Sequence, residues 1–180
     1  LVGKSVLNLL KNKGFKNIIT VVRKKLDLRN FDKVKKFFKK KRIDYMVMAA
    51  ARAGGIIANS SNQKDFYLQN VEIQNSLLKL ALEKKIKRTI YLGTSCIYPK
   101  FAKNPIKEES LLTGELEKTN QCYAIAKISG IKLSEALFND YKLNIICLMP
   151  TNVYGLNDNF NMTNGLSLIH ISEPTRPSQI

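Results

Sequence analysis

Short apolar runs rich in β-branched residues alternate along the chain with longer stretches in which apolar residues recur at helical spacing. The short runs, which we expect to be strands, are residues 17–22, 45–50, 89–93 and 143–149. The longer stretches, which we expect to be helices, are residues 3–13, 30–41, 65–85 and 123–141. This alternation predicts parallel strands joined by right-handed helical crossovers. We therefore expect the α/β class, with a doubly wound parallel sheet.

The two ends of the chain depart from this pattern. The first helical stretch begins at Gly3 with no strand before it, so we expect the first strand of the sheet to be missing. Residues 166–180 (LSLIHISEPTRPSQI) break the alternation, and residues 166–176 resemble an in-frame translation of a sequencing-library adaptor. We expect a partial dinucleotide-binding domain over residues 1–165 and a non-native tail over residues 166–180, with a native loop as the alternative. His170 is therefore given no role.

The chain is strongly basic, because 30 Lys and Arg residues against 14 Asp and Glu residues give a formal net charge of +16. Only residues 33–42 (KVKKFFKKKR) are dense in basic residues. We interpret this stretch as a solvated helix face and expect neither nucleic acid nor a membrane as a partner. A basic nucleic-acid-binding module stays open as an alternative class. The charge would also attract an anionic pyrophosphate substrate.

Two further observations concern the compartment. No apolar run is long enough to span a bilayer, and the chain begins without a signal-peptide pattern. Cys96, Cys122 and Cys147 have unrelated spacings, which favour neither a disulfide framework nor a metal site. These features fit a reducing, cytoplasmic location.

Residues typical of a Rossmann-like domain occur at three of the expected turns. Gly3 stands where the last glycine of a phosphate-binding turn packs its helix against the sheet. Arg23 follows the second strand of such a domain, where a basic side chain suits the 2′-phosphate of NADP(H) and an acidic one suits NAD. Plain surface charge is the alternative for residues 23–25. Ala50 opens a run of small residues that leaves room for a cofactor or, alternatively, serves tight packing.

Side chains able to do acid–base chemistry occur after the fourth strand and on the last expected helix. Thr94 and Cys96 follow residues 89–93, at the strand end where open α/β sheets bind ligands. Tyr123 and Lys127 are spaced i, i+4 and so share one helix face. We expect the Lys127 ammonium to lower the pKa of the Tyr123 phenol. The Tyr-x-x-x-Lys spacing also arises by chance, and a free Cys is more often a packing residue.

Four segments carry a specific resemblance. AAARAGGIIAN, LGTSCIYPK, LTGELEKTNQCYAIAKISGIKL and MPTNVYGLNDNF resemble, in this order, the GDP-L-fucose synthase family of extended short-chain dehydrogenases/reductases. The resemblance covers residues 1–165 and implies, for the full-length parent protein, NADPH-dependent 3,5-epimerisation and 4-reduction of the nucleotide sugar GDP-4-keto-6-deoxy-D-mannose. We expect the fragment by itself to be inactive. It also implies a homodimer and a C-terminal substrate domain that this chain lacks. The alternative within the class is another NADP-dependent nucleotide-sugar epimerase or dehydratase.

The resemblance implies a role for individual residues. Cys96 stands at the position of the base, Thr94 at that of the group that polarises the carbonyl, and Tyr123, supported by Lys127, at that of the proton donor. The implied cofactor contacts are Gly3, Arg23, Asp27, Leu28, Ala50, Leu92, Gly93, Thr94, Ser95, Lys127, Pro150, Thr151, Asn152 and Val153. The chain departs from the family at Leu166, where the family has a His that acts as the second acid, and at Lys118, Gln121, Cys122 and Asn161.

Overall fold

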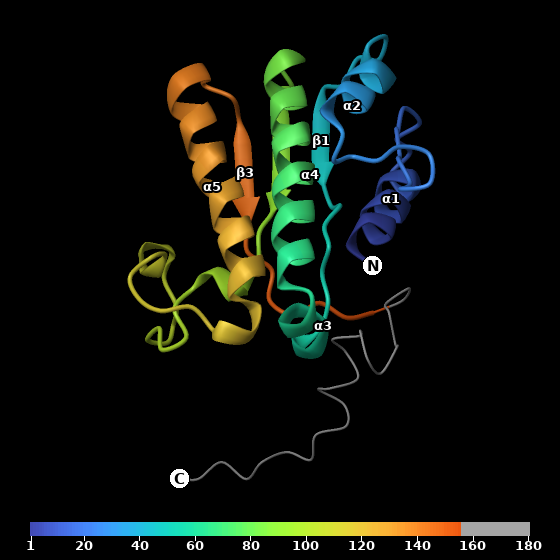
Figure 1. Ribbon diagram of the computed structural model, residues 1–180. Coiled ribbons are helices and arrows are strands. Elements are labelled where there is room, and N and C mark those ends of the chain that lie inside the picture. The colour runs from blue at the N-terminus through green and yellow to red at the C-terminus, as the bar shows by residue number, and fades with distance from the viewer. Residues whose placement is uncertain (156–180) are drawn as a thin grey trace.

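The computed structural model describes residues 1–155, in which helices and strands alternate (Figure 1). The α-helices are α1 (Val2–Asn12), α2 (Phe31–Phe38), α3 (Ile56–Ser61), α4 (Gln63–Glu83) and α5 (Gln121–Tyr141). The strands are β1 (Tyr45–Met48), β2 (Arg88–Leu92) and β3 (Ile145–Leu148). Three short 3₁₀ helices are η1 (Ser95–Ile97), η2 (Glu108–Ser110) and η3 (Lys118–Asn120).

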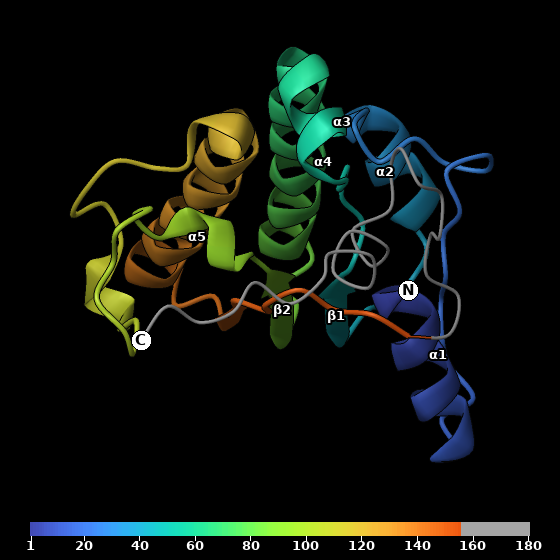
Figure 2. The same cartoon turned by 90° about the horizontal axis from the view of Figure 1, so that it is seen from below.

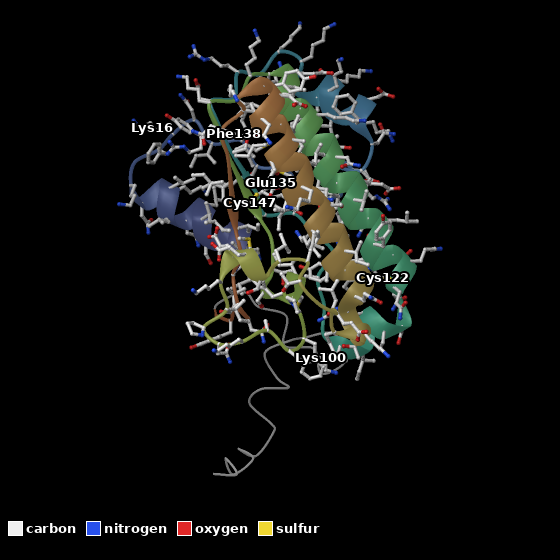
Figure 3. The ribbon with its side chains drawn as sticks, turned by 90° about the vertical axis from the view of Figure 1, so that its left-hand side faces the viewer. Lys16, Lys100, Cys122, Glu135, Phe138 and Cys147 are labelled. Atoms are coloured by element: carbon white, nitrogen blue, oxygen red, sulfur yellow. The ribbon has the colours of Figure 1, made fainter. Side chains whose placement is uncertain are left out.

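The three strands form one parallel sheet in the order β1-β2-β3. Helices α4 and α5 lie side by side over one face of the sheet, and α1 lies on the other side (Figures 2 and 3). All strands run in one direction, so their carboxyl ends meet at one edge of the sheet, near α3 (Figure 1). The predicted doubly wound α/β fold is confirmed.

The strand predicted at residues 17–22 is wrong. The structure holds these residues in an irregular conformation, and no described strand pairs with them or with the outer edge of β1. Val21 packs against the small core cluster around Val34 and Phe38, whereas the side chains of Ile19 and Val22 are exposed. An apolar, β-branched run forms a strand only where a neighbouring strand supplies hydrogen bonds, which composition alone does not reveal.

Helices α4 and α5 end in the same way. Each is followed by a lysine in the left-handed conformation, Lys85 with φ 47° and Lys142 with φ 55°. The next residue in each case is a buried aliphatic side chain, Ile86 or Leu143. The Ile86 amide donates to the carbonyl of Ala81 over 3.0 Å, which satisfies a carbonyl at the end of α4. These two turns direct the chain into β2 and β3.

The core lies between the sheet and helices α4 and α5. Its fully buried members include Leu78 of α4, Tyr91 of β2 and Ile97 of η1. Within residues 1–155, no helix combines the length and the apolar character that a membrane span requires. Our interpretations of Asn161, Leu166, His170 and the tail concern residues outside those that the structure describes.

Candidate active site

The carboxyl ends of β2 and β3 are joined by backbone hydrogen bonds. The Gly93 amide donates to the Leu148 carbonyl over 2.8 Å, and the Ser95 amide donates to the Pro150 carbonyl over 3.2 Å. Thr94 caps η1, because its side-chain oxygen accepts a hydrogen bond from the Cys96 amide over 3.3 Å. The turn that carries the hydroxyl and the thiol is therefore tied to the strand end that leads into residues 150–153.

Lys127 lies in the buried face of α5 and is only 5% exposed. Its Nζ donates a 2.8 Å hydrogen bond to the Leu92 carbonyl, at the last residue of β2. The same Nζ lies 5.0 Å from the ring centroid of Tyr91 and 6.0 Å from that of Tyr123. Burial disfavours the charged form and lowers the pKa of Lys127 to about 8. The ammonium is therefore held at the end of the strand from which Thr94 and Cys96 follow.

Tyr123 stands near both residues of the β2 turn. Burial is the main cause that raises its pKa to about 12, and Cys96 acts in the same direction. A hydrogen bond with the Thr94 side chain opposes them. The expectation that Lys127 lowers the pKa of this phenol is wrong here, because burial raises that pKa and the Lys127 ammonium is bonded to the Leu92 carbonyl instead. Tyr123 is thus a protonated phenol near neutral pH.

An aromatic residue that the sequence interpretation did not single out adjoins Tyr123, and a basic residue packs on that aromatic ring. Phe66 of α4 is 2% exposed, and its ring meets that of Tyr123 edge to face at 6.1 Å between centroids. The Arg52 guanidinium lies 5.1 Å from the Phe66 ring centroid. Asn70 fixes the Arg52 backbone, because its side chain accepts from the Arg52 amide over 3.0 Å and donates to the Arg52 carbonyl over 2.9 Å. These contacts join distant segments, so no local sequence pattern indicated them.

A second network ties α4 to the helix that carries the Tyr–Lys pair. Gln74 of α4 donates to the Ala126 carbonyl over 2.8 Å and to the Ser129 hydroxyl over 2.9 Å. Its side-chain oxygen accepts from the Tyr91 hydroxyl over 2.7 Å. Since Gln74 is 3% exposed and Tyr91 is 1% exposed, this network is fully buried. It fixes the position of α5 along the sheet, because one side chain of α4 is bonded to both α5 and β2.

The residues predicted to contact the adenine end of a cofactor lie before α2. Asp27 accepts hydrogen bonds from the Arg29 side chain at both carboxylate oxygens, the shorter pair joining Asp27 Oδ2 and Arg29 Nη2 at 2.6 Å. Arg29, which the sequence interpretation missed, thereby holds the pKa of Asp27 at about 2, and Arg23 contributes in the same direction. Arg23 therefore lies close enough to Asp27 for their charges to interact.

Gly3 lies in the first turn of α1, beside the end of β1. A Cβ added to Gly3 would meet the Ala49 Cβ at 3.5 Å, an ordinary contact, so close packing does not by itself require glycine here. The available donor groups fit a phosphorylated dinucleotide. Arg23 offers a guanidinium before α2, near Asp27. The Lys127 ammonium and the Thr94 hydroxyl lie at the carboxyl end of β2. Within residues 1–155, no cluster of three or more His, Cys, Asp or Glu side chains offers a metal site.

The parallel sheet, the open strand ends and the Tyr–Lys pair of α5 define a Rossmann-like dinucleotide-binding domain. The chain belongs to the NAD dependent epimerase/dehydratase family, whose sequence profile matches residues 1–171.

Individual relatives agree with this assignment. The chain is 44% identical over 164 residues to GDP-L-fucose synthase 1 of Arabidopsis thaliana, which is 91% of this chain and 51% of that protein. The structure of a GDP-L-fucose synthetase from Naegleria fowleri bound to NADP is similar with a TM-score of 0.81 and 32% identity, over 92% of this chain and 55% of that one. The structure of a GDP-mannoheptose C4 reductase from Campylobacter jejuni with NADP bound is similar with a TM-score of 0.84 and 34% identity, over 87% of this chain and 50% of that one. The chain spans about half the length of the relatives it matches.

Proposed function

We propose that the protein acts as a GDP-L-fucose synthase, an NADPH-dependent enzyme that epimerises GDP-4-keto-6-deoxy-D-mannose at C3 and C5 and then reduces its C4 ketone. The observation that carries the proposal is the setting of Tyr123. A hydroxyl, a thiol and an ammonium, from Thr94, Cys96 and Lys127, surround one protonated phenol. The similarity to GDP-L-fucose synthases supports the choice of substrate.

Ketone reduction requires a proton at the carbonyl oxygen. When bound, NADPH supplies the hydride that reduces C4. The raised pKa of Tyr123 keeps its phenol protonated and able to donate to the C4 oxygen. The Thr94 hydroxyl, already within hydrogen-bond reach of Tyr123, polarises the same carbonyl. Lys127 stabilises the negative charge that develops on the phenol oxygen after it gives up its proton.

Epimerisation at C3 and C5 requires a base, because the 4-keto group acidifies the C–H bonds on either side of it. Cys96 follows Thr94 by two residues, is only partly buried and lies close enough to Tyr123 to influence it, which supports a place for its sulfur beside the substrate. We assign Cys96 as this base. Phe66 borders the site next to Tyr123, and Arg52 packs on the Phe66 ring.

The cofactor is assigned as NADP(H). Arg23 would bind the 2′-phosphate, Asp27 and Leu28 would border the adenine, and Gly3 would face the pyrophosphate. Ala50 and residues 92–95 would line the path of the cofactor, Lys127 would hold the nicotinamide ribose, and residues 150–153 would adjoin the nicotinamide. The NADP bound to two similar proteins supports this assignment.

A homodimer and a cytoplasmic location complete the proposal. The exposed apolar side chains of Tyr67 and Leu68 on α4 and of Ile125 on α5 support a contact between copies through these neighbouring helices. Cys96, Cys122 and Cys147 are all unpaired, which supports a reducing compartment.

One assay tests the function directly. The longest form of the protein that the gene encodes is incubated with NADPH and GDP-4-keto-6-deoxy-D-mannose, and the products are separated and identified by NMR. GDP-L-fucose as the product supports the proposal. Consumption of NADPH with a product of unchanged configuration at C3 and C5 would instead identify a C4 reductase, like the similar GDP-mannoheptose C4 reductase of Campylobacter jejuni.

A further inference from the structure

A basic hollow lies at the end of the sheet opposite the candidate active site. It has a volume of about 470 Å³ and is formed by the loop from α2 to β1 and the loop from α4 to β2 (upper end in Figure 1). Residues 39–42 and Lys84, Lys85 and Lys87 contribute seven basic side chains to its wall. Backbone hydrogen bonds from the Lys87 and Arg88 amides to the Asp44 carbonyl, at 3.0 and 3.4 Å, hold the two loops together.

Some of these cations already have partners. The Asp44 carboxylate, the one acidic group in the wall, pairs with Arg42 at 3.2 Å and with Lys87 at 3.0 Å. Lys84 Nζ donates to the carbonyls of Lys39 and Lys41 over 2.9 and 3.3 Å. These cations hold the walls of the hollow in place.

Other cations in the wall have no anionic partner. Among residues 1–155, no ion pair engages the side chains of Lys39, Lys40 or Lys85, all three of which are exposed. Lys41 Nζ lies 4.7 Å from the Phe37 ring centroid, a contact that leaves its positive charge uncompensated. Two different loops thus place several uncompensated ammonium groups around one hollow.

Structural needs account for only part of this charge. Lysines at helix ends commonly offset the helix dipole, and both α2 and α4 end at this hollow. Each helix C-terminus carries about half a negative charge, and Asp44 adds one more. Seven cations exceed that total several-fold, and their mutual repulsion in so small a space is unfavourable. An anion with several charges close together would remove the repulsion.

We propose that this hollow binds a compact polyphosphate anion, recognised through its phosphate groups by Lys39, Lys40, Lys41 and Lys85. Ammonium groups act as point charges that suit phosphate oxygens in many orientations. The site would therefore recognise phosphate groups by their negative charge. The basic residues come from two short loops that meet in one open, shallow hollow, and not from an extended track, which favours a compact ligand over a nucleic-acid strand. The site shares no residue with the candidate active site and does not depend on the proposed enzymatic function.

The test is calorimetric titration of the 180-residue chain with inorganic tripolyphosphate, at about 50 mM salt so that surface charges are only partly screened. A triple variant, K39Q/K40Q/K85Q, removes the three ammonium groups without ion pairs. A control variant, K11Q/K13Q/K16Q, removes the same total charge from α1 and the loop after it. Lys16 lies on the side of the sheet away from α4 and α5 (Figure 3). Circular dichroism checks that all three proteins are folded.

We expect tripolyphosphate to bind, and the hollow variant to bind it about tenfold or more weakly, since three exposed charge contacts are lost. The control variant should lose at most about twofold. An equal loss in both variants would overturn the proposal, because net charge alone would then explain binding, and so would absence of binding to the unmodified chain.

Two further ligands identify the source of the phosphates. ATP binding within about threefold of tripolyphosphate, and weakened by the same hollow substitutions, supports recognition of phosphate groups alone. A uridine oligonucleotide that binds far more tightly than either, and more weakly in the hollow variant, would overturn the proposal in favour of a nucleic-acid surface. Because ATP can also enter the cofactor site, only binding lost in the hollow variant is assigned to the hollow.

Discussion

The Tyr91 hydroxyl donates a hydrogen bond to the Gln74 side-chain oxygen in the space beside Gly130, where a Cβ would overlap the hydroxyl oxygen and lie 2.6 Å from Gln74 Oε1. At Gly130, side chains from β2 and α4 therefore pack directly against the backbone of α5. Although glycine disfavours a helix interior by about 1 kcal/mol relative to alanine, its lack of a side chain is required here.

We predict that Gly130→Ala destabilises the protein by about 1–3 kcal/mol, because overpacking a closed site outweighs the gain in helix propensity. Chemical denaturation measures the change in the free energy of unfolding. Tyr91→Phe should cost less stability in the Gly130→Ala background than alone, since it removes the nearest of the three atoms that the new Cβ would meet, leaving Tyr91 Cζ and Gln74 Oε1. Additive effects of the two substitutions would show that the clash is relieved elsewhere.

Lys127 should make stability depend on pH. Its pKa is about 8 in the folded protein, against 10.5 for the unperturbed side chain. Between these pH values the unfolded chain holds the proton that the folded chain has lost, so the free energy of unfolding rises with pH, by roughly 2 kcal/mol from pH 7 to 9.5. The difference in stability between the natural chain and Lys127→Met should change by that amount over this range. A difference that stays constant would mean that Lys127 titrates normally.

Cys96 and Tyr123 should separate the two chemical stages. In the longest form that the gene encodes, Cys96→Ser should slow deuterium incorporation from solvent at C3 and C5 by about 100-fold or more, while reduction of a pre-epimerised ketone is largely kept. Tyr123→Phe should show the opposite pattern. NMR follows the exchange, and NADPH absorbance follows the reduction. If exchange persists at the natural rate in Cys96→Ser, this thiol is a packing residue.

Arg23 should set the preference for the phosphorylated cofactor. Loss of a charge-assisted contact in Arg23→Ala should lower the ratio of NADPH to NADH affinity by about tenfold or more. Fluorescence titration with both cofactors measures the ratio, and Lys16→Ala is the charge-matched control. An unchanged ratio in Arg23→Ala would assign the preference to another residue.

Local patterns predicted much of this molecule. Apolar residues at helical spacing located α2, α4 and α5 to within a few residues, and continuous apolar runs located the three strands. The same kind of pattern failed at residues 17–22, because pairing depends on a neighbouring strand. The catalytic roles assigned to the candidate site residues remain predictions.

The candidate site also has features that local spacing predicted and features that only the folded chain creates. The i, i+4 spacing correctly placed Tyr123 and Lys127 on one helix face, and both lie near the end of β2. The direction of the Tyr123 pKa shift was not predictable, because it follows from burial created by distant segments. The contacts of Phe66 and Arg52 were not predictable for the same reason, since only the folded chain brings Phe66 of α4 to the phenol and Arg52 to Phe66.

The parallel register of β2 and β3 also has a kinetic consequence. Thr89 pairs with Ile145, so the intervening turn, loops and all of α5 must be enclosed before this ladder closes. Contacts between residues so far apart in sequence form slowly, because the entropy of a long loop is lost before any contact is gained. Lys127 reaches the Leu92 carbonyl only across that closed crossover. On refolding, helix signals should therefore return early, and the Tyr–Lys arrangement should be among the last features to recover.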